Sequence, residues 1–482
     1  MSVTTGEDEF AGAAGEVRDA EALVPLFDVG GEIARLAEAC VHCGLCNASC
    51  PTYLLSGDER EGPRGRIALI RRLGEAGGGR AATGVVARHI DRCLGCHACE
   101  AACPTAVPFG PLLRHGRALV RRSRRGTRAR RLVNWFAVNV VPRPDRLGWF
   151  VRLAPLARRA GNWISSGRLS ALGRIAGTAA ERAGRRAAFQ GPGTAKTRRQ
   201  RRGRVILLAG CVQQVLRPSI TDCGIRVLAR SGIDVEVAAG AGCCGAVRAE
   251  QGDLEGARRL ARANIEAWSK SLGREPADAI LTTAGGCGAM LADYHCLFGP
   301  GDDIGGRARA ISEAAEDITS YIARIGIGPP RRYSTLRVGC HAACSLANAA
   351  GADALGGDAA TMQRDLIHSA GFTGISVARE RICCGGAGSY PFLEPETARV
   401  LRDQTTDDIR AARVDVVATG SLGCLNHLKA DLSQPVVHTI ELIDWAHGGP
   451  VPPGLERLAG EIQDVEGIET LATLDFIAAR SD

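Results

Sequence analysis

The chain lacks the features that mark membrane-spanning and secreted proteins. Aromatic residues make up only 4% of its 482 residues, and no apolar run approaches the 18 residues that a membrane-spanning helix needs. The first ten residues, MSVTTGEDEF, are acidic and contain neither the basic nor the apolar stretch of a signal peptide. We therefore expect a cytoplasmic protein whose thiols are kept reduced.

The chain also lacks the common motifs of nucleotide binding and hydrolysis. No G-x-G-x-x-G sequence follows an expected strand to open a helix, and neither a P-loop nor a G-x-S-x-G elbow occurs. Carboxylates are not paired near the cysteines, so acid–base hydrolysis has no candidate residues. We expect no FAD, NAD or ATP site on this chain, and we name no catalytic residue.

What the chain does have is 19 cysteines, most of them in groups. The number is too low for a disulfide scaffold in a chain of this length, and the grouping is too regular for chance core thiols. Under reducing conditions, grouped cysteines usually serve metal or redox chemistry.

Two of these groups repeat the pattern C-x₂-C-x₂-C-x₃-C-P, starting at Cys40 and at Cys93. In this pattern three thiolates bind different irons of one cubane, and the fourth binds the neighbouring cluster. Zinc is the alternative, but zinc favours separated cysteine pairs, which this spacing does not provide. The expected ligands of the first [4Fe–4S] cluster are Cys40, Cys43, Cys46 and Cys103. Those of the second are Cys93, Cys96, Cys99 and Cys50.

The pattern along the chain predicts a multidomain protein: a small α-helical ferredoxin-like domain with two [4Fe–4S] clusters, followed by a duplicated α/β Cys-Cys-Gly region. From residue 204 short β-rich runs alternate with longer helical patterns, and the alternation restarts after Tyr333. The expected segments are a flexible leader (1–30), the ferredoxin-type domain (31–115), a basic helical connector (116–203), and two Cys-Cys-Gly domains (204–333 and 334–482).

Each α/β half contains two adjacent cysteines before a glycine, flanked by single cysteines. Neighbouring side chains on a strand point to opposite faces, so two thiols serve one site only if the glycine allows a sharp turn. The alternative is that these cysteines are ordinary buried thiols. Cys344 lies outside the repeated spacing, although it could replace a missing ligand. The candidate additional cluster or redox sites are Cys211, Cys243, Cys244 and Cys287, and Cys340, Cys383, Cys384 and Cys424.

Two ferredoxin runs followed by two Cys-Cys-Gly repeats resemble the iron–sulfur subunits of the glycolate oxidase, lactate utilisation, anaerobic glycerol-3-phosphate dehydrogenase and heterodisulfide reductase group. The segments Cys383–Tyr390, Thr419–Cys424 and Pro435–Asp444 are most similar to the glycolate oxidase iron–sulfur subunit. This resemblance implies an electron-transfer subunit of an oxidoreductase complex. The FAD would lie on a partner FAD-linked oxidase subunit that oxidises glycolate, and the isolated chain would be inactive. Electrons would leave to a quinone or another acceptor.

The resemblance leaves alternatives open. The complex could instead oxidise D-lactate or glycerol-3-phosphate. A heterodisulfide-reductase-like thiol/disulfide reductase subunit and a redox-sensing docking protein belong to other classes. The fuller Cys-Cys-Gly pattern ends each repeat in Cys-x-x-Cys, whereas this chain has Met290 and His427 at the last positions. That departure argues against disulfide reduction and leaves open whether the repeats hold one, two or no further clusters.

Residues 114–204 contain 25 arginines and lysines but only two acids, Asp145 and Glu181. Apolar residues alternate with the basic ones, which suggests amphipathic helices. The segment is interpreted as a solvated connector, or as a surface that docks to an acidic partner or to anionic lipid at the inner face of the cell membrane. Nucleic-acid binding is disfavoured because no recognised motif accompanies the charge.

Overall fold

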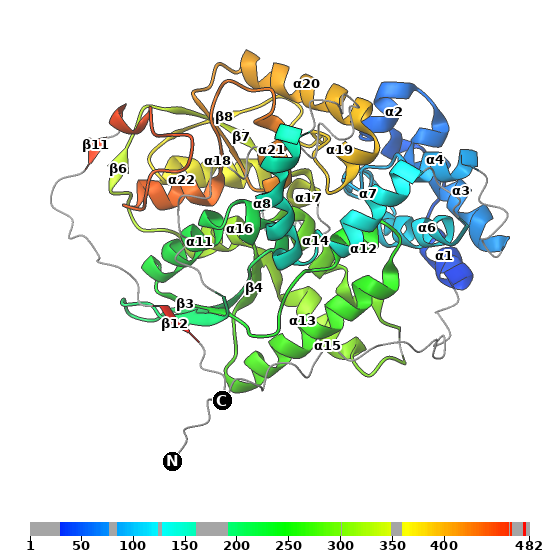
Figure 1. The fold of residues 1–482 in the computed structure, drawn as a ribbon, viewed down its shortest axis with the longest axis horizontal. Coiled ribbons are helices and arrows are strands. Elements are labelled where there is room, and N and C mark those ends of the chain that lie inside the picture. The colour runs from blue at the N-terminus through cyan, green and yellow to red at the C-terminus, as the bar shows by residue number, and fades with distance from the viewer. Residues whose placement is uncertain are drawn as a thin grey trace.

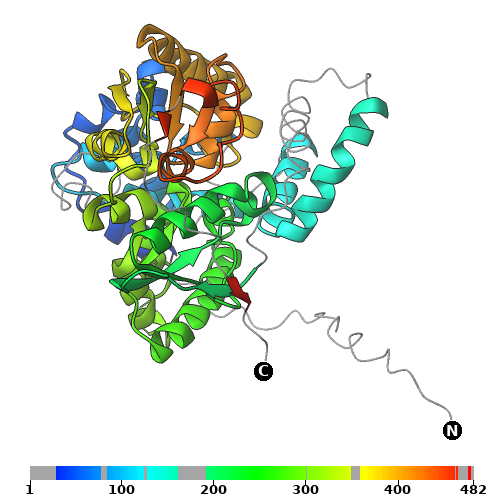
Figure 2. The same ribbon diagram turned by 90° about the vertical axis from the view of Figure 1, so that its left-hand side faces the viewer.

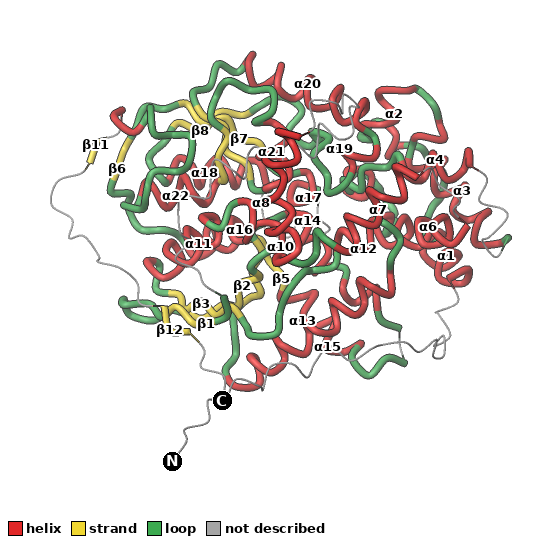
Figure 3. The backbone as a smooth tube through the Cα atoms, in the orientation of Figure 1, coloured by secondary structure: helices red, strands yellow, loops and turns green. Residues whose placement is uncertain are grey.

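The computed structural model describes residues 29–76, 84–123, 128–160, 191–299, 301–348, 359–461, 463–464 and 476–478. In these residues a helical N-terminal region packs against two α/β halves (Figure 1). Figure 3 shows two main groups of strands with helices between them, and a further pair of short strands at the left-hand side. The expected leader lies outside the described residues, except for its last two positions.

The N-terminal region is a helical cluster built around one apolar core. Its helices are α1 (Val29–Ala37), α2 (Pro51–Ser56), α3 (Pro63–Glu75), α4 (Gly84–Asp91), α5 (Ala98–Ala101) and α6 (Phe109–Ser123). Its longest apolar helix faces, on α3 and α6, pack together in this core. A boundary was expected after residue 115, but α6 runs through it. The reason is that Leu112 and Leu113 before this point and Leu119 and Val120 after it are buried in the same core.

Two helices then form a hairpin that stands out from the rest of the molecule, as Figure 2 shows. They are α7 (Arg128–Asn139) and α8 (Pro144–Ala160). The rings of Phe136 and Phe150 meet edge to face, with their centroids 4.6 Å apart, and hold the two helices together.

The first α/β half contains four parallel strands whose residues are almost entirely buried: β2 (Gly203–Leu208), β3 (Ile233–Val237), β4 (Ala279–Thr282) and β5 (Ala315–Asp317). Burial along the whole strand is typical of parallel strands covered on both faces. The helices of this half are α10 (Cys211–Leu216), α11 (Ser219–Arg230), α12 (Ala246–Glu250), α13 (Leu254–Arg274), α14 (Gly285–Ala292), α15 (Gly305–Ala314) and α16 (Ile318–Ile325).

The second half repeats this arrangement with β7 (Arg337–His341), β8 (Thr373–Ser376), β9 (Val416–Thr419) and β10 (Val436–His438). Its spatial order, β8-β7-β9-β10, matches the order β3-β2-β4-β5 of the first half, and all four strands are again parallel. The expected duplication is therefore confirmed. The helices are α17 (Cys344–Ala347), α18 (Ala359–Ser369), α19 (Tyr390–Leu393), α20 (Pro395–Ala411), α21 (Leu422–Leu428) and α22 (Thr439–Ala446).

The C-terminal part departs from the expected division at residue 333. Strand β12 (Phe476–Ala478) pairs with β1 (Gly193–Ala195), which itself pairs with β3, so the last segment extends the first sheet. Strand β11 (Gln463–Asp464) pairs with β6 (Arg332–Tyr333). An edge strand offers unpaired backbone groups to any segment that can reach it, whatever its place in the sequence.

The two halves share a core and a set of buried ion pairs. Ile220 and Leu228 of α11 lie in one apolar cluster with Ile440 and Trp445 of α22. Arg217 donates from Nε and Nη2 to the Glu441 carboxylate at 2.8 Å each. In the described part of the chain, no helix combines the length and apolar character needed to cross a bilayer.

Candidate metal centres

The first ferredoxin run brings its expected thiols together. Cys40, Cys43, Cys46 and Cys103 line one hollow of about 410 Å³ that opens to solvent. The chain turns tightly here because His42 and Gly44 adopt left-handed backbone conformations, with φ of 55° and 81°. Cys43 is exposed. The structure thus places Cys103, from the end of the second run, beside the first three cysteines, and Cys99 lines the same hollow.

The second run forms a buried counterpart. Burial, together with the nearby thiols of Cys96, Cys93 and Cys50, raises the pKa of Cys99. Cys50 reaches this group because it is the residue immediately before α2, at the end of the first run. All four of these cysteines are at most 9% exposed. Cys50, from the end of the first run, therefore lies near the cysteines of the second run, and the assignment of these four thiols to one cluster stays a prediction.

Two arginines accompany this second group, Arg66 buried and Arg117 half-buried. Arg66 is 1% exposed, and its Nη1 lies 3.9 Å from Cys50 Sγ while its Nη2 donates to Glu61 at 2.7 Å. Arg117 donates from Nη2 to the carbonyl oxygen of Cys93 at 2.6 Å. Positive charge at this position offsets the negative charge of buried thiolates.

The first Cys-Cys-Gly repeat also gathers its four candidate thiols. Cys211 Sγ lies 3.4 Å from Cys243 Sγ, and Cys244 Sγ lies 3.2 Å from Cys287 Sγ. Hydrogen bonds from the thiols of Cys211 and Cys244 lower the pKa of Cys243. The group lies beyond the carboxyl ends of β2, β3 and β4, where open α/β sheets place their binding loops. Gly245, with φ of 89°, makes the turn that places both adjacent thiols here.

Two side chains bind the backbone of the turn that carries Cys243 and Cys244. Asn264 donates from Nδ2 to the carbonyl oxygen of Cys243 at 3.0 Å, and the Tyr294 hydroxyl donates to that of Cys244 at 2.9 Å. No sequence motif marked either residue. A buried asparagine and a buried tyrosine on helical segments would have been the signal.

The second repeat corrects one sequence-based prediction. A hydrogen bond with Cys383 and burial raise the pKa of Cys344, and Cys383 in turn contacts Cys384, which contacts Cys424. Cys340 was expected in this group, but it lies inside β7, where its Sγ is 3.6 Å from the carbonyl oxygen of Val338 and packs in the core.

The physical reason is the position of the strand end. Cys211 follows the last residue of β2 by three positions, and Cys344 follows the last residue of β7 by three positions. A thiol within the strand points into a sheet face, whereas one just beyond the strand can turn over its carboxyl end. Cys344 is therefore the counterpart of Cys211.

The second ferredoxin group and the second repeat lie against each other. Burial and the nearby Cys344 thiol raise the pKa of Cys96, and the nearby Cys96 thiol helps to raise the pKa of Cys383. Leu94, Cys96 and Cys383 belong to one apolar cluster. Asn348 donates from Nδ2 to the carbonyl oxygen of Cys96 at 3.1 Å. No sequence pattern predicted this contact.

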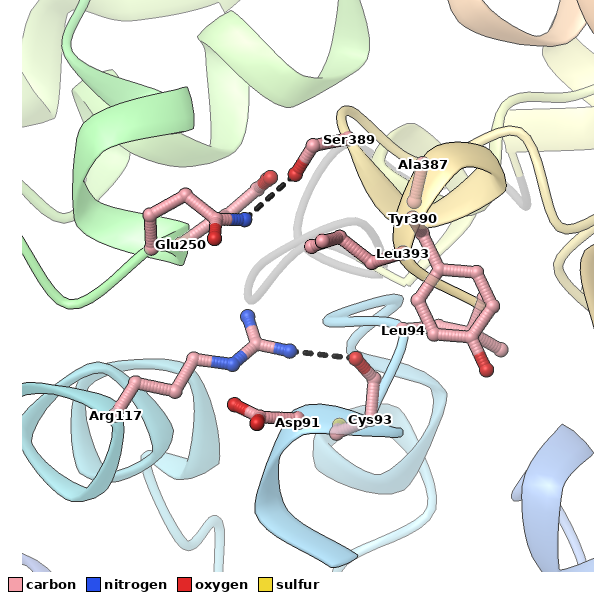
Figure 4. Close-up of a pocket in the computed structure, with 10 residues that line it drawn as sticks. Asp91, Cys93, Leu94, Arg117, Glu250, Ala387, Ser389, Tyr390 and Leu393 are labelled. Atoms are coloured by element: carbon pink, nitrogen blue, oxygen red, sulfur yellow. Dashed lines mark hydrogen bonds between the residues drawn. The ribbon is translucent and has the colours of Figure 1, made fainter. Parts of the chain in front are cut away.

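A hollow of about 440 Å³ lies beside Cys93 where the helical region meets both α/β halves (Figure 4). In Figure 4, Arg117 reaches from α6 to the Cys93 carbonyl group. Gln251, after α12, donates from Nε2 to Ser389 Oγ at 2.6 Å. The Tyr390 hydroxyl donates to the carbonyl oxygen of Arg92 at 3.1 Å. The Tyr390 contact joins the second ferredoxin group to the second half, and the Gln251 contact joins the two halves beside it.

The donor sets fit iron–sulfur clusters. A [4Fe–4S] cluster binds its four thiolates at four irons, so its ligands surround a cube rather than a single ion. Within the described residues, no three ligand side chains are arranged around one metal-ion position. The two residues that replace the last cysteines of the fuller pattern lie elsewhere. Met290 is buried in an apolar cluster, and His427 Nε2 lies 3.1 Å from the carbonyl oxygen of Ala398.

Comparisons with known proteins agree with this arrangement. Residues 36–107 match the model of a 4Fe-4S dicluster domain, and residues 205–292 and 338–429 match the model of a cysteine-rich domain. The glycolate oxidase iron-sulfur subunit of Escherichia coli is 34% identical over 415 residues, which cover 86% of this chain and 95% of that protein. The chain belongs to the glycolate oxidase iron–sulfur subunit family.

Two further relatives extend the comparison. A probable glycolate oxidase iron-sulfur subunit of Bacillus subtilis is 27% identical over 85% of this chain and 94% of its own length. Lactate utilization protein A of Oceanobacillus iheyensis is 22% identical over 52% of this chain. The resemblance seen in the sequence is thus confirmed. As a member of this family, the chain is an iron–sulfur subunit of an oxidoreductase, with two [4Fe–4S] clusters in its ferredoxin-type region.

Proposed function

We propose that this chain carries electrons from a flavin on a partner FAD-linked oxidase subunit, where glycolate is oxidised, to an acceptor such as a quinone. The observation that carries the proposal is the contact of Cys96 with Cys344 and Cys383. It joins the ferredoxin groups to the Cys-Cys-Gly groups within one molecule. Each bound cluster supplies a centre that takes up and releases one electron.

The exposure of the thiols suggests a direction of electron transfer through the cysteine groups. Cys43 is exposed, and next to it Val41 and Leu45 are 65% and 60% exposed, so a partner can approach the first group closely. The second group is buried, and it adjoins the Cys344 group. Electrons would enter at the first group and pass through the second to the repeats.

The residues around the second group exclude water and position charge. The buried Arg66 and the half-buried Arg117 would offer positive charge to the thiolates of a bound cluster. Leu94, Tyr390 and Leu401 close the group from the side of the second half. Oxidising a 2-hydroxy acid removes a hydride equivalent, which a flavin accepts and a cubane does not.

The ligand assignments belong to this proposal. We assign Cys40, Cys43, Cys46 and Cys103 to the first cluster and Cys93, Cys96, Cys99 and Cys50 to the second. We further propose iron at the two repeats, with Cys344 replacing Cys340. A complex for D-lactate is the second candidate, and the likeness to lactate utilization protein A over half of the chain favours it.

Reconstitution tests the proposal. The chain purified without oxygen should show no flavin absorbance and should not reduce a dye when glycolate is added. Addition of the FAD-bearing subunit should restore dye reduction with glycolate. Restoration with D-lactate alone would establish the second candidate. Glycolate-dependent dye reduction by the flavin-free chain would refute the proposal, since it would place the chemistry at the Cys-Cys-Gly groups.

A further inference from the structure

The hairpin of α7 and α8 uses its inner faces for packing. Phe136 and Phe150 meet between the two helices, and Ala137, Val138 and Leu147 are at most 5% exposed. Helix α7 also contacts α12 and α19, and α8 contacts α10. The hairpin is therefore attached to the body at its base, while Figure 2 shows it projecting outward.

The outer faces expose apolar side chains that nothing in the described part of the chain covers. Leu132 and Trp135 of α7 are 61% and 56% exposed, and Trp149 and Leu153 of α8 are 66% and 51% exposed. On each helix the two residues are three or four positions apart, so they lie on one face. The two other tryptophans that the structure describes, Trp268 and Trp445, are at most 2% exposed.

Arginines accompany these apolar residues. Residues 128–160 contain eight arginines and a single acid, Asp145. Arg131 adjoins Leu132, Arg146 precedes Trp149 by one turn, and Arg152 adjoins Leu153; all three arginines are exposed. Each of the four exposed apolar residues named above therefore has an arginine within one turn of the helix.

We propose that the α7–α8 hairpin binds the surface of an anionic phospholipid bilayer. The two helices have 12 and 17 residues, too few to span a bilayer, so they would lie in the plane of the interface. Trp135, Trp149 and the two leucines enter the boundary between headgroups and acyl chains. The arginines bind the lipid phosphates.

The arginines of the hairpin favour a lipid surface over a protein as its binding partner. The cores of protein interfaces are poor in charged residues, whereas here arginine alternates with tryptophan and leucine. That mixture is typical of helices that lie in a membrane interface. A protein partner also has a different apolar surface available, around Val41 and Leu45 beside the first ferredoxin group. The inference stands on the hairpin alone and does not rest on the proposed function.

Vesicle sedimentation of the intact, cluster-loaded chain tests the inference. The chain should sediment with vesicles of phosphatidylcholine and phosphatidylglycerol, and much less with vesicles of phosphatidylcholine alone. Rising salt should release it. The double variant Trp135→Ala/Trp149→Ala should bind the anionic vesicles at least about tenfold more weakly. Tyr333→Ala, which removes another half-exposed aromatic ring far along the chain, is the matched control and should bind like the unaltered protein.

Charge and folding are tested separately. Arg146→Gln/Arg152→Gln should weaken binding to anionic vesicles and flatten its salt dependence. Iron content and circular dichroism should be unchanged in both double variants. Failure of the unaltered chain to bind anionic vesicles, or equal binding by the tryptophan variant, would overturn the inference. So would a tryptophan variant that keeps vesicle binding but no longer assembles with the FAD-bearing subunit, because the hairpin would then be a protein-docking site.

Discussion

Cys340 and Cys344 differ by only four positions, yet they have different environments. Cys340 is completely buried within β7, and Gly374 of β8 lies beside its sulfur. Cys344 begins α17 and contacts Cys383. At the scale of single residues, the direction of the thiol decides whether it can bind a cluster, and that direction changes at the end of the strand.

The two cysteines provide a matched pair of variants. Cys344→Ser should remove about four irons per chain, because a serine hydroxyl is a far poorer iron ligand than a thiolate. Cys340→Ala should keep the full iron content and lower the free energy of unfolding by about 1 kcal/mol through the lost packing. Iron and sulfide analysis after anaerobic purification measures both. Iron loss in Cys340→Ala but not in Cys344→Ser would restore the assignment made from sequence.

At the scale of elements, the two α/β halves are joined by charges as well as by a core. Arg217 follows α10 and Glu441 lies in the first turn of α22, and both side chains are 1% exposed. Ser219 Oγ also donates to Glu441 at 2.7 Å. Arg217 and its hydrogen bonds lower the pKa of Glu441 against the opposing effect of burial. The pair thus fixes α22, and with it β10, against the first half.

Removal of one partner should reveal this coupling. Arg217→Met should lower the free energy of unfolding by about 3–5 kcal/mol, because it leaves the Glu441 carboxylate buried without its counter-charge. The double variant Arg217→Met/Glu441→Leu should recover most of the loss. Denaturant unfolding of the iron-loaded protein measures both values. Equal losses in the single and double variants would show that packing, and not charge, holds this contact.

At the scale of the whole molecule, the four cysteine groups form a row. The ferredoxin groups share one core, the second of them touches the Cys344 group, and α14, which carries Cys287, packs against α17, which begins with Cys344. An added Cβ on Gly285 of α14 would press on the Ser345 hydroxyl of α17, so the missing side chain at Gly285 helps the two helices to approach.

The order of the groups predicts the effect of removing a ligand from the second ferredoxin group. Cys96→Ser should leave the first ferredoxin cluster reducible and the partner bound, and it should lower acceptor reduction at least about tenfold, because it alters a ligand at the junction. Electron paramagnetic resonance would follow the clusters, and circular dichroism would control for folding. Undiminished acceptor reduction by the folded variant would show that electrons bypass the second group.

Much of the site could be predicted from the sequence because its chemistry is encoded over short distances. In each ferredoxin run four cysteines lie within eleven residues, so their spacing alone indicates the cluster type, whereas the crossed fourth ligand stays a prediction. The duplication was visible because strands and helices recur in the same order, and the strand order is the same in both halves. The glycines after each cysteine pair predicted turns that the structure confirms.

Only the tertiary structure decided what depends on distant residues or on the exact end of a strand. Asn348 bonds to the Cys96 carbonyl group across 252 positions, and no local pattern encodes that contact. Cys340 and Cys344 could not be told apart until the last residue of β7 was known. The exposure of Trp135 and Trp149 likewise depends on which helix faces the rest of the fold covers. Ligand spacing is a property of neighbouring residues, whereas contact and exposure are properties of the packed chain.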